Sequence, residues 1–231
     1  MENHDGIDKR IQHGGDRQRN STPTLLDLFG QVALSKSGEI AIEACGNRLT
    51  YRELDEWSNR VAHALIVWGI DRGQVVAIAS TACAGAVASM LGTWKIGAVC
   101  FLFDPADKCG QFDSIMQRVG VSLVVAMGTS ETALDTPLPQ LILDDDDIAG
   151  YSNLSVSGCA DLPEPAYFIS EPHSTETPVQ VIAAQGSAMP GYPVGVTGPR
   201  VLRNMTSAES ITELIEALAQ GVVLVMPSAS E

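Results

Sequence analysis

The stretch AYFISEPHSTETPVQV, residues 166–181, places hydroxyl side chains directly after a short apolar run. A strand followed by such a loop is typical of a phosphate-binding site, because backbone amides and hydroxyls can donate to phosphate oxygens. Ser174 and Thr175 are the side chains that could do so, and they are our candidate nucleotide-binding residues. The stretch nevertheless contains no glycine and no lysine, which phosphate loops need.

Other groups that could do chemistry have simpler interpretations. His173 could act as a general base, but a histidine in an exposed loop is the simpler reading. Four consecutive aspartates, residues 144–147, could bind a divalent cation, although acidic runs are usually solvated turns. The five cysteines form no CxxC pair, which argues against structural zinc or a disulfide framework. We therefore expect no catalytic residue and no metal site.

Composition limits the class of protein. With 231 residues, 45% of them hydrophobic and 18% charged, the chain has the makeup of a soluble globular domain. The net charge of −14 argues against nucleic acid or an anionic membrane surface as a partner. Residues 1–20 have no apolar period and no signal-peptide core, so we expect a disordered tail on a cytoplasmic protein.

The elements that position the candidate loop follow from periodicity. A helix is expected after Thr22 or Thr24, then a hairpin turning at residues 45–48. Thr50 followed by Glu53 is a capping box. The helix that it opens carries an apolar stripe that we expect to lie in the core and that ends before Gly69: Leu54, Trp57, Val61, Leu65 and Trp68.

Strands and helices then alternate. Residues 75–94 carry no charge for 20 positions, but they are rich in Ala, Ser, Thr and Gly, so we expect a strand and then a helix rather than a membrane span. The remaining apolar segments predict strands at 98–103 and 123–126, a helix at 111–119 and a short strand before the aspartates. Near the end of the sequence, they predict a helix capped by Ser207 and ended by Gly221, followed by a buried strand at 222–226. The stretch between residue 181 and the helix capped by Ser207 is predicted to form loops. The pattern predicts an α/β fold with a mostly parallel sheet and helices on both faces.

Three isolated residues have structural interpretations. Lys95 lies at the end of a predicted helix, where it would interact with the last carbonyls. Cys83 and Cys100 lie within apolar segments and are expected to be small core residues.

Two motifs resemble the adenylation domains of nonribosomal peptide synthetases and their AMP-forming ligase relatives. LTYREL, residues 49–54, is similar to the family's L-T-Y-x-E-L motif. WKIGAVCFLFDP, residues 94–105, resembles the family's L-K-A-G-x-A-Y-V-P-L-D-P. The resemblance implies the N-terminal part of an adenylate-forming fold.

The candidate loop resembles the family's ATP phosphate loop, Y-T-S-G-[ST]-T-G-x-P-K-G, in part. Ser174, Thr175 and Pro178 match the pattern. The three glycines of the pattern fall on His173, Glu176 and Gln180, and its lysine falls on Val179. The last predicted helix resembles the segment after the family's substrate-anchoring aspartate, whose position falls on Ala208, next to Glu209.

The resemblance covers roughly residues 22–231 and less than half of the family's length. It implies a truncated, degenerate adenylation domain without independent activity, related to synthetases of secondary metabolism. ATP and Mg²⁺ would be its cofactors if any activity remained. Two alternatives stay open: a ligase completed by a partner chain, and a noncatalytic interaction module. The partner would be a larger synthetase or a homologous domain, and a sheet edge cut off near residues 222–226 could mediate complementation or self-association.

Overall fold

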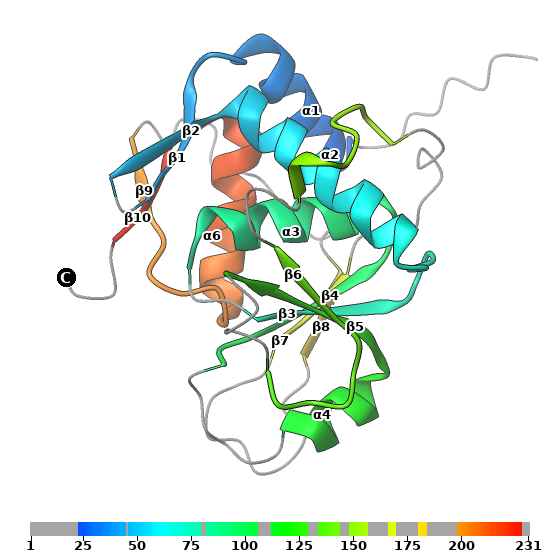
Figure 1. The fold of residues 1–231 in the computed structure, drawn as a ribbon. Helices are drawn as coiled ribbons and strands as arrows, with labels where there is room; N and C mark the ends of the chain where they lie inside the picture. Colours follow the sequence, from blue (N-terminus) through cyan, green and yellow to red (C-terminus); the bar gives the residue numbers. More distant parts are fainter. Residues whose placement is uncertain are drawn as a thin grey trace, which may run out of the picture.

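The computed structural model describes residues 23–44, 46–79, 82–105, 112–128, 134–143, 148–156, 166–169, 180–183 and 198–227. Within these residues the chain forms two sheets (Figure 1). The strands of the larger sheet are β3 (Val75–Ala79), β4 (Val99–Phe103), β5 (Val121–Met127), β6 (Gln140–Leu143), β7 (Ala166–Ile169) and β8 (Gln180–Ala183). Those of the smaller sheet are β1 (Ile40–Ala44), β2 (Asn47–Thr50), β9 (Arg200–Val201) and β10 (Leu224–Met226).

The larger sheet has the order β6-β5-β3-β4-β7-β8, and its neighbouring strands are parallel except for β7 and β8. The helices are α1 (Leu25–Ser35), α2 (Tyr51–Val67), α3 (Ala84–Lys95), α4 (Phe112–Val119) and α6 (Ala208–Gln220). Figure 1 shows α4 on one side of the sheet and α2 and α3 on the other. The predicted α/β fold, with a mostly parallel sheet covered on both faces, is confirmed.

Local sequence signals set the ends of the helices. Thr24 and Asp27 form a capping box at the start of α1, and Thr50 and Glu53 form another at the start of α2. Ser207 caps α6, and Gly221 ends that helix with a φ of 71°, a left-handed conformation that glycine adopts without strain. These predictions are confirmed.

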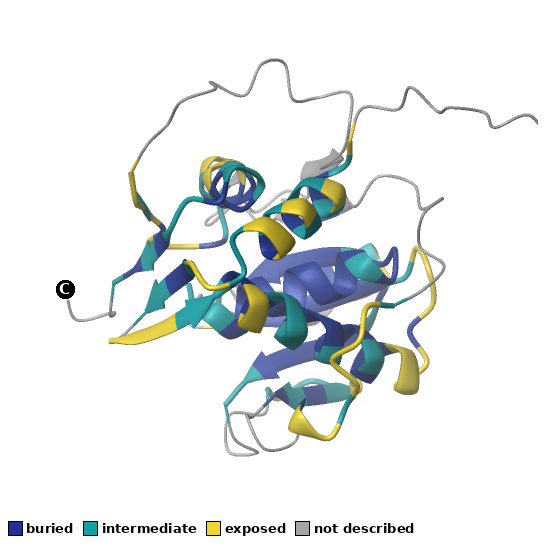
Figure 2. Cartoon of the chain, turned by 90° about the horizontal axis from the view of Figure 1, so that it is seen from above, coloured by how far each residue is buried: buried dark blue, intermediate teal, exposed yellow. Residues whose placement is uncertain are grey.

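The apolar stretch at residues 75–94 is divided as predicted into a strand and a helix. All five residues of β3 are buried, and α3 is buried along most of its length because α2 covers it. Figure 2 shows the buried elements in the middle of the molecule and the exposed residues on its outer faces. No helix in the described part of the chain is long and apolar enough to cross a membrane.

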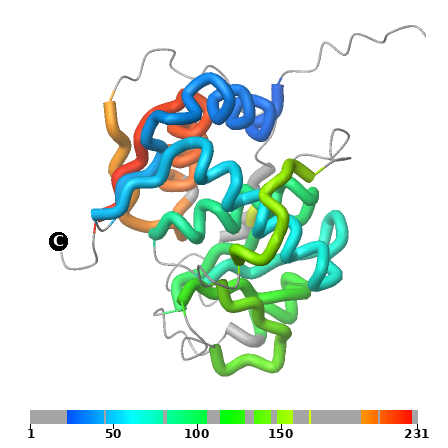
Figure 3. Tube along the Cα trace, turned by 45° about the horizontal axis from the view of Figure 1, so that its top comes forward, coloured from blue at the N-terminus to red at the C-terminus, as the bar shows by residue number. Residues whose placement is uncertain are grey.

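The two ends of the described chain pack together. Strand β1 pairs with β10 in parallel, and the side chain of Lys36 donates to the carbonyl of Gly221 at 3.0 Å. Figure 3 shows the blue N-terminal segments beside the red C-terminal ones. The sheet that they share was not predicted, because its pairing joins segments far apart in the sequence.

Three predictions are wrong. Trp68 is 44% exposed rather than in the core, because α2 ends at Val67 and the chain turns before the stripe is complete. Residues 222–226 do not form a cut edge, because β10 lies between β1 and β9. The stretch after residue 181, predicted as loops, includes the end of β8 and all of β9.

Candidate functional site

The candidate loop connects two neighbouring strands of the larger sheet. Strand β7 ends at Ile169 and β8 begins at Gln180, and these two residues pair across the antiparallel ladder. Residues 170–179 therefore start and finish at adjacent positions. His173, Ser174 and Thr175 belong to this segment and lie outside the described residues.

Strand β7, which precedes this segment in the sequence, ends at an edge of the sheet where ligands commonly bind. Strands β3, β4, β5 and β7 run parallel, so their carboxyl ends meet at one edge. In open α/β sheets, ligands bind in the crevice outside that edge. Residues 170–179 follow the carboxyl end of β7 in the sequence, and the candidate site itself lies outside the described residues.

Strand β7 packs firmly against the helix layer. The ring of Tyr167 is buried and packs against Trp94 of α3, with 6.5 Å between the ring centroids. Burial raises the pKa of Tyr167 to about 12, so its hydroxyl stays protonated at neutral pH. Tyr167 therefore anchors the strand to the helix layer.

The start of α6 is the second predicted element of the site. Ala208, at the family's aspartate position, is the first residue of the helix, and the hydroxyl of Ser207 accepts the backbone N–H of Ser210 at 3.2 Å. Glu209 is exposed in the first turn, where a negative charge stabilises a helix N-terminus. Glu209, the residue next to the family's aspartate position, is thus a solvated carboxylate.

Among the residues that the structure describes, no three metal-binding side chains gather. The aspartate run, residues 144–147, lies outside them. The thiol of Cys100 is fully buried, and burial raises its pKa well above the usual range, which leaves it unreactive. The interpretation of Cys100 as a core residue is confirmed, and Cys83 and Trp57 pack at the margin of the same core.

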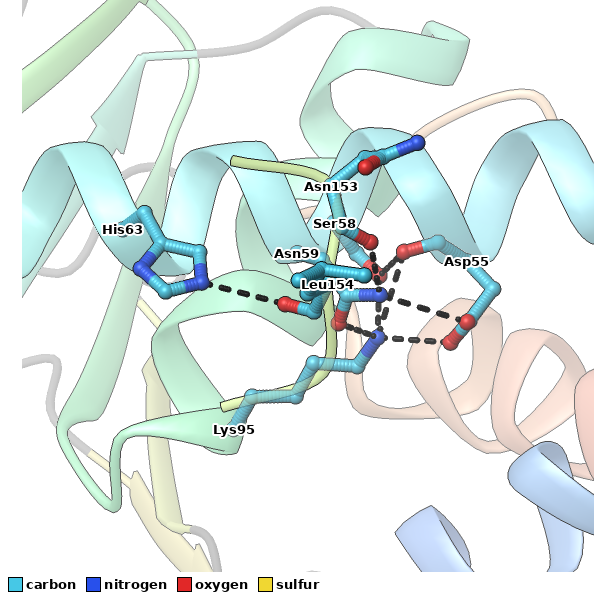
Figure 4. Close-up of polar contacts among 7 residues, drawn as sticks. All are labelled: Asp55, Ser58, Asn59, His63, Lys95, Asn153 and Leu154. Atoms are coloured by element: carbon cyan, nitrogen blue, oxygen red, sulfur yellow. Dashed lines mark hydrogen bonds and ion pairs between the residues drawn. The ribbon is translucent and has the colours of Figure 1, made fainter. Parts of the chain in front are cut away.

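Lys95 lies in a polar cluster that sequence reasoning missed. Instead of capping the carbonyls of its own helix, its ammonium donates to Asp55, Ser58 and Asn59 of α2 (Figure 4). The prediction for Lys95 is wrong because α2 presents these oxygens within reach of the lysine. The spacing of Asp55, Ser58 and Asn59, three and four residues apart on one helix face, was the available signal.

Comparison with known proteins identifies the family. Residues 29–190 match the AMP-binding enzyme family. A dimodular nonribosomal peptide synthase of Bacillus subtilis is 32% identical over 172 residues, which is 71% of this chain and 7% of that protein. Bacitracin synthase 1 of Bacillus licheniformis is 27% identical over 211 residues, 88% of this chain and 4% of that protein. The chain thus spans a small fraction of these relatives.

Solved structures share the fold. The nonribosomal peptide synthetase FmoA3 superposes with a TM-score of 0.77 at 21% identity, covering 88% of this chain and 22% of that one. The N-terminal subdomain of NpsA from Klebsiella oxytoca superposes with a TM-score of 0.74 at 20% identity, covering 89% and 55% of the two chains. The chain therefore belongs to the AMP-binding enzyme family and is related to the adenylation domains of nonribosomal peptide synthetases.

Proposed function

We propose that this chain is an adenylation-domain protein that does not bind and activate ATP on its own. The observation that carries this proposal is the composition of residues 170–179, which contain no glycine, no lysine and no arginine and include Glu171 and Glu176. The fold supports the comparison with a phosphate loop, because the segment follows β7 at the carboxyl edge of the sheet.

The donor set does not fit a nucleoside triphosphate. Glycines let backbone amides approach phosphates closely, and a lysine compensates the phosphate charge. At about 4 Å and an effective dielectric constant near 20, each like-charge pair costs on the order of 4 kcal/mol. Glu176, at a glycine position of the family pattern, adds such a pair, while Ser174 and Thr175 offer neutral donors only. These residues do not support the acyl-adenylate reaction of the family.

A second candidate function is a ligase component that another polypeptide completes. The relatives are large synthetases, of which this chain matches 4% and 7%, and this fits a larger synthetase as the context for such a component. Completion or self-association would use a sheet edge. Among the described strands, the smaller sheet ends at β2 and β9 and the larger sheet at β6 and β8. This function predicts nucleotide binding only in the presence of the partner.

A thermal melt of the full chain with and without Mg·ATP tests the proposal. A ligand at 100 times its Kd adds about 2.7 kcal/mol of stability, and a chain of this size gains about 2–4 °C in Tm per kcal/mol. We expect no shift for the natural chain. A clear rise in Tm would overturn the proposal.

A matched variant makes the negative result informative. His173→Gly, Glu176→Gly and Val179→Lys together restore two glycines and the lysine of the family pattern. We expect this triple variant to gain an upward shift with Mg·ATP. Glu213→Gln on the exposed face of α6 controls for the loss of one negative charge and should gain none. If the triple variant shows no shift in Tm with Mg·ATP, the composition of the loop is not the reason for the missing ATP binding.

A further inference from the structure

The ammonium group of Lys95 is enclosed by oxygen atoms of α2. It donates to Asp55 Oδ1, Ser58 Oγ and Asn59 Oδ1, each at 2.7 Å, and lies 3.3 Å from the carbonyl of Asp55 (Figure 4). The ring of Phe29 lies on another side, with its centroid 5.7 Å from Nζ. We call Asp55, Ser58 and Asn59 the ammonium cage.

The cage is built for a primary ammonium. Such a group carries three N–H donors, and the three side-chain oxygens accept one each. The side chain of Lys95 is only 13% exposed, so little water competes for these oxygens. A planar guanidinium presents its donors in a flat fork and does not match three oxygens placed around one nitrogen.

The lysine fixes the orientation of the Asn59 amide. Because an ammonium can only donate, the amide oxygen of Asn59 must face Lys95, and the amide nitrogen must point the other way. That nitrogen donates to the carbonyl of Asn153 at 2.9 Å and lies 3.3 Å from Asp55 Oδ2. Asn59 is itself buried, with 2% of its surface exposed, so an unpaired amide there would be costly.

Asn153 belongs to residues 148–156, which we call the strap. One helical turn beyond Asn59, His63 Nε2 lies 3.0 Å from the carbonyl of Leu154. Figure 4 shows both contacts on the same face of α2. The ends of the strap pack on the core through Ile148, Tyr151 and Val156. Its middle differs, because Leu154 is 73% exposed and the described contacts of Asn153 and Leu154 with α2 are polar.

We propose that the cage is a recognition site for a primary ammonium group, and that its occupancy by Lys95 fastens the middle of the strap to α2 through Asn59. This role does not depend on nucleotide binding.

Hydrogen exchange of the full-length Lys95→Met variant tests the fastening. Methionine keeps an apolar stem but cannot orient Asn59. We expect the amides of Tyr151 and Leu154, which are bonded within the strap, to exchange about tenfold faster relative to those of β3 and β4. Lys36→Met is the matched control, because it removes another ammonium–carbonyl bond without touching the strap. Unchanged strap exchange in Lys95→Met would overturn the proposal.

Chemical rescue tests the recognition site itself. Lys95→Ala removes the equivalent of propylammonium, and adding propylammonium should restore slow strap exchange and raise the Tm. Tetramethylammonium at the same concentration carries the same charge without N–H donors, so it should neither slow strap exchange nor raise the Tm. Equal effects of the two cations would overturn ammonium recognition.

A second variant keeps the test decisive if removal of Lys95 prevents folding. Asn59→Leu leaves Asp55 and Ser58 to hold the lysine but removes the link to Asn153. We expect fast strap exchange while β3 and β4 stay protected. Full protection of the strap in this variant would show that Asn59 does not fasten it.

Discussion

Tyr51, within the first family motif, connects the two ends of the described chain. Its side chain is fully buried at the start of α2, and its hydroxyl donates to the carbonyl of Val222 at 2.9 Å. The carbonyl of Ala217, 3.4 Å from the same hydroxyl, already accepts the backbone N–H groups of Gly221 and Val222. The motif residue therefore satisfies one carbonyl just after α6 in addition to filling the core.

Tyr51→Phe should lower the free energy of unfolding by about 1–2 kcal/mol, because it leaves the carbonyl of Val222 without this donor in a part-buried position. Denaturant unfolding of the two proteins measures the difference. Tyr151→Phe is the control, because no hydrogen bond of that hydroxyl is found within the described residues, and it should change stability by less than about 0.5 kcal/mol. Equal effects of the two substitutions would contradict this role of Tyr51.

The contribution of Glu53 to stability should depend on pH. The backbone N–H of Thr50, followed by its hydroxyl, donates to the carboxylate and lowers the pKa of Glu53. A lowered folded-state pKa means that this contribution is present above the unfolded value of about 4.3 and is lost as the pH falls through the folded pKa. The stability advantage of the natural chain over Glu53→Gln should therefore shrink on acidification from pH 6 to pH 3. A difference that is constant over this range would rule the contribution out.

At the scale of elements, Gly92 sets how closely α3 approaches α2. A Cβ at this position would lie 2.8 Å from the carbonyl oxygen of Ser58 and 2.8 Å from Val61. Both are closer than real Cβ atoms come, and the first is backbone that cannot rotate away. The glycine therefore permits the contact that also brings Lys95 to the ammonium cage.

Gly92→Ala should be destabilising by about 1–2 kcal/mol, because a clash against backbone lies at the upper end of the overpacking cost of about 1–3 kcal/mol, and the helix-propensity gain offsets only about 1 kcal/mol of it. Gly30→Ala in α1 is the matched control: an added Cβ meets nothing within 4 Å, so only the propensity gain remains and stability should rise. Thermal melts of the two variants should shift in opposite directions. Shifts of the same sign would mean that Gly92 is not a packing constraint.

The elements that sequence predicts well are those with local signals. The capping box of Thr50 and Glu53, the cap at Ser207 and the left-handed Gly221 fix helix ends without reference to the rest of the chain. Strand β3 is predicted to the residue because all its positions are apolar and buried. Such signals were enough for the α/β fold and for strand β7.

The elements that were missed depend on distant partners. Strand β9 has two residues, and only its pairing with β10 makes it a strand. The exposure of Trp68 depends on where α2 stops, and the contacts of Lys95 depend on how α3 crosses α2. Tertiary placement decides these features, and hydrophobic periodicity carries no information about it.

At the scale of the whole molecule, the two sheets share one core. Buried side chains of the smaller sheet and α6, such as Ile42 and Leu214, belong to the same cluster as Val76 and Leu102 of the larger sheet. Helices α1, α2, α3 and α6 all contribute buried side chains to this cluster. The opposite face of the larger sheet buries a second cluster against α4. Because its other face shares a core with the smaller sheet and α6, we expect the described chain to unfold as one unit.

The substitution Leu214→Ala tests whether the described chain unfolds as one unit. Leu214 is fully buried in α6, and its truncation should cost about 2–5 kcal/mol. Far-UV circular dichroism and the fluorescence of the buried Trp94 should report a single transition that shifts by the same amount with both probes, when Trp57 and Trp68 are replaced by phenylalanine so that Trp94 alone emits. Leu34→Ala, at a site that is 84% exposed, should leave that transition in place. If the mutation instead splits the transition, so that Trp94 reports the natural midpoint while circular dichroism moves, the smaller sheet and α6 form a separate folding unit and the shared core does not couple them.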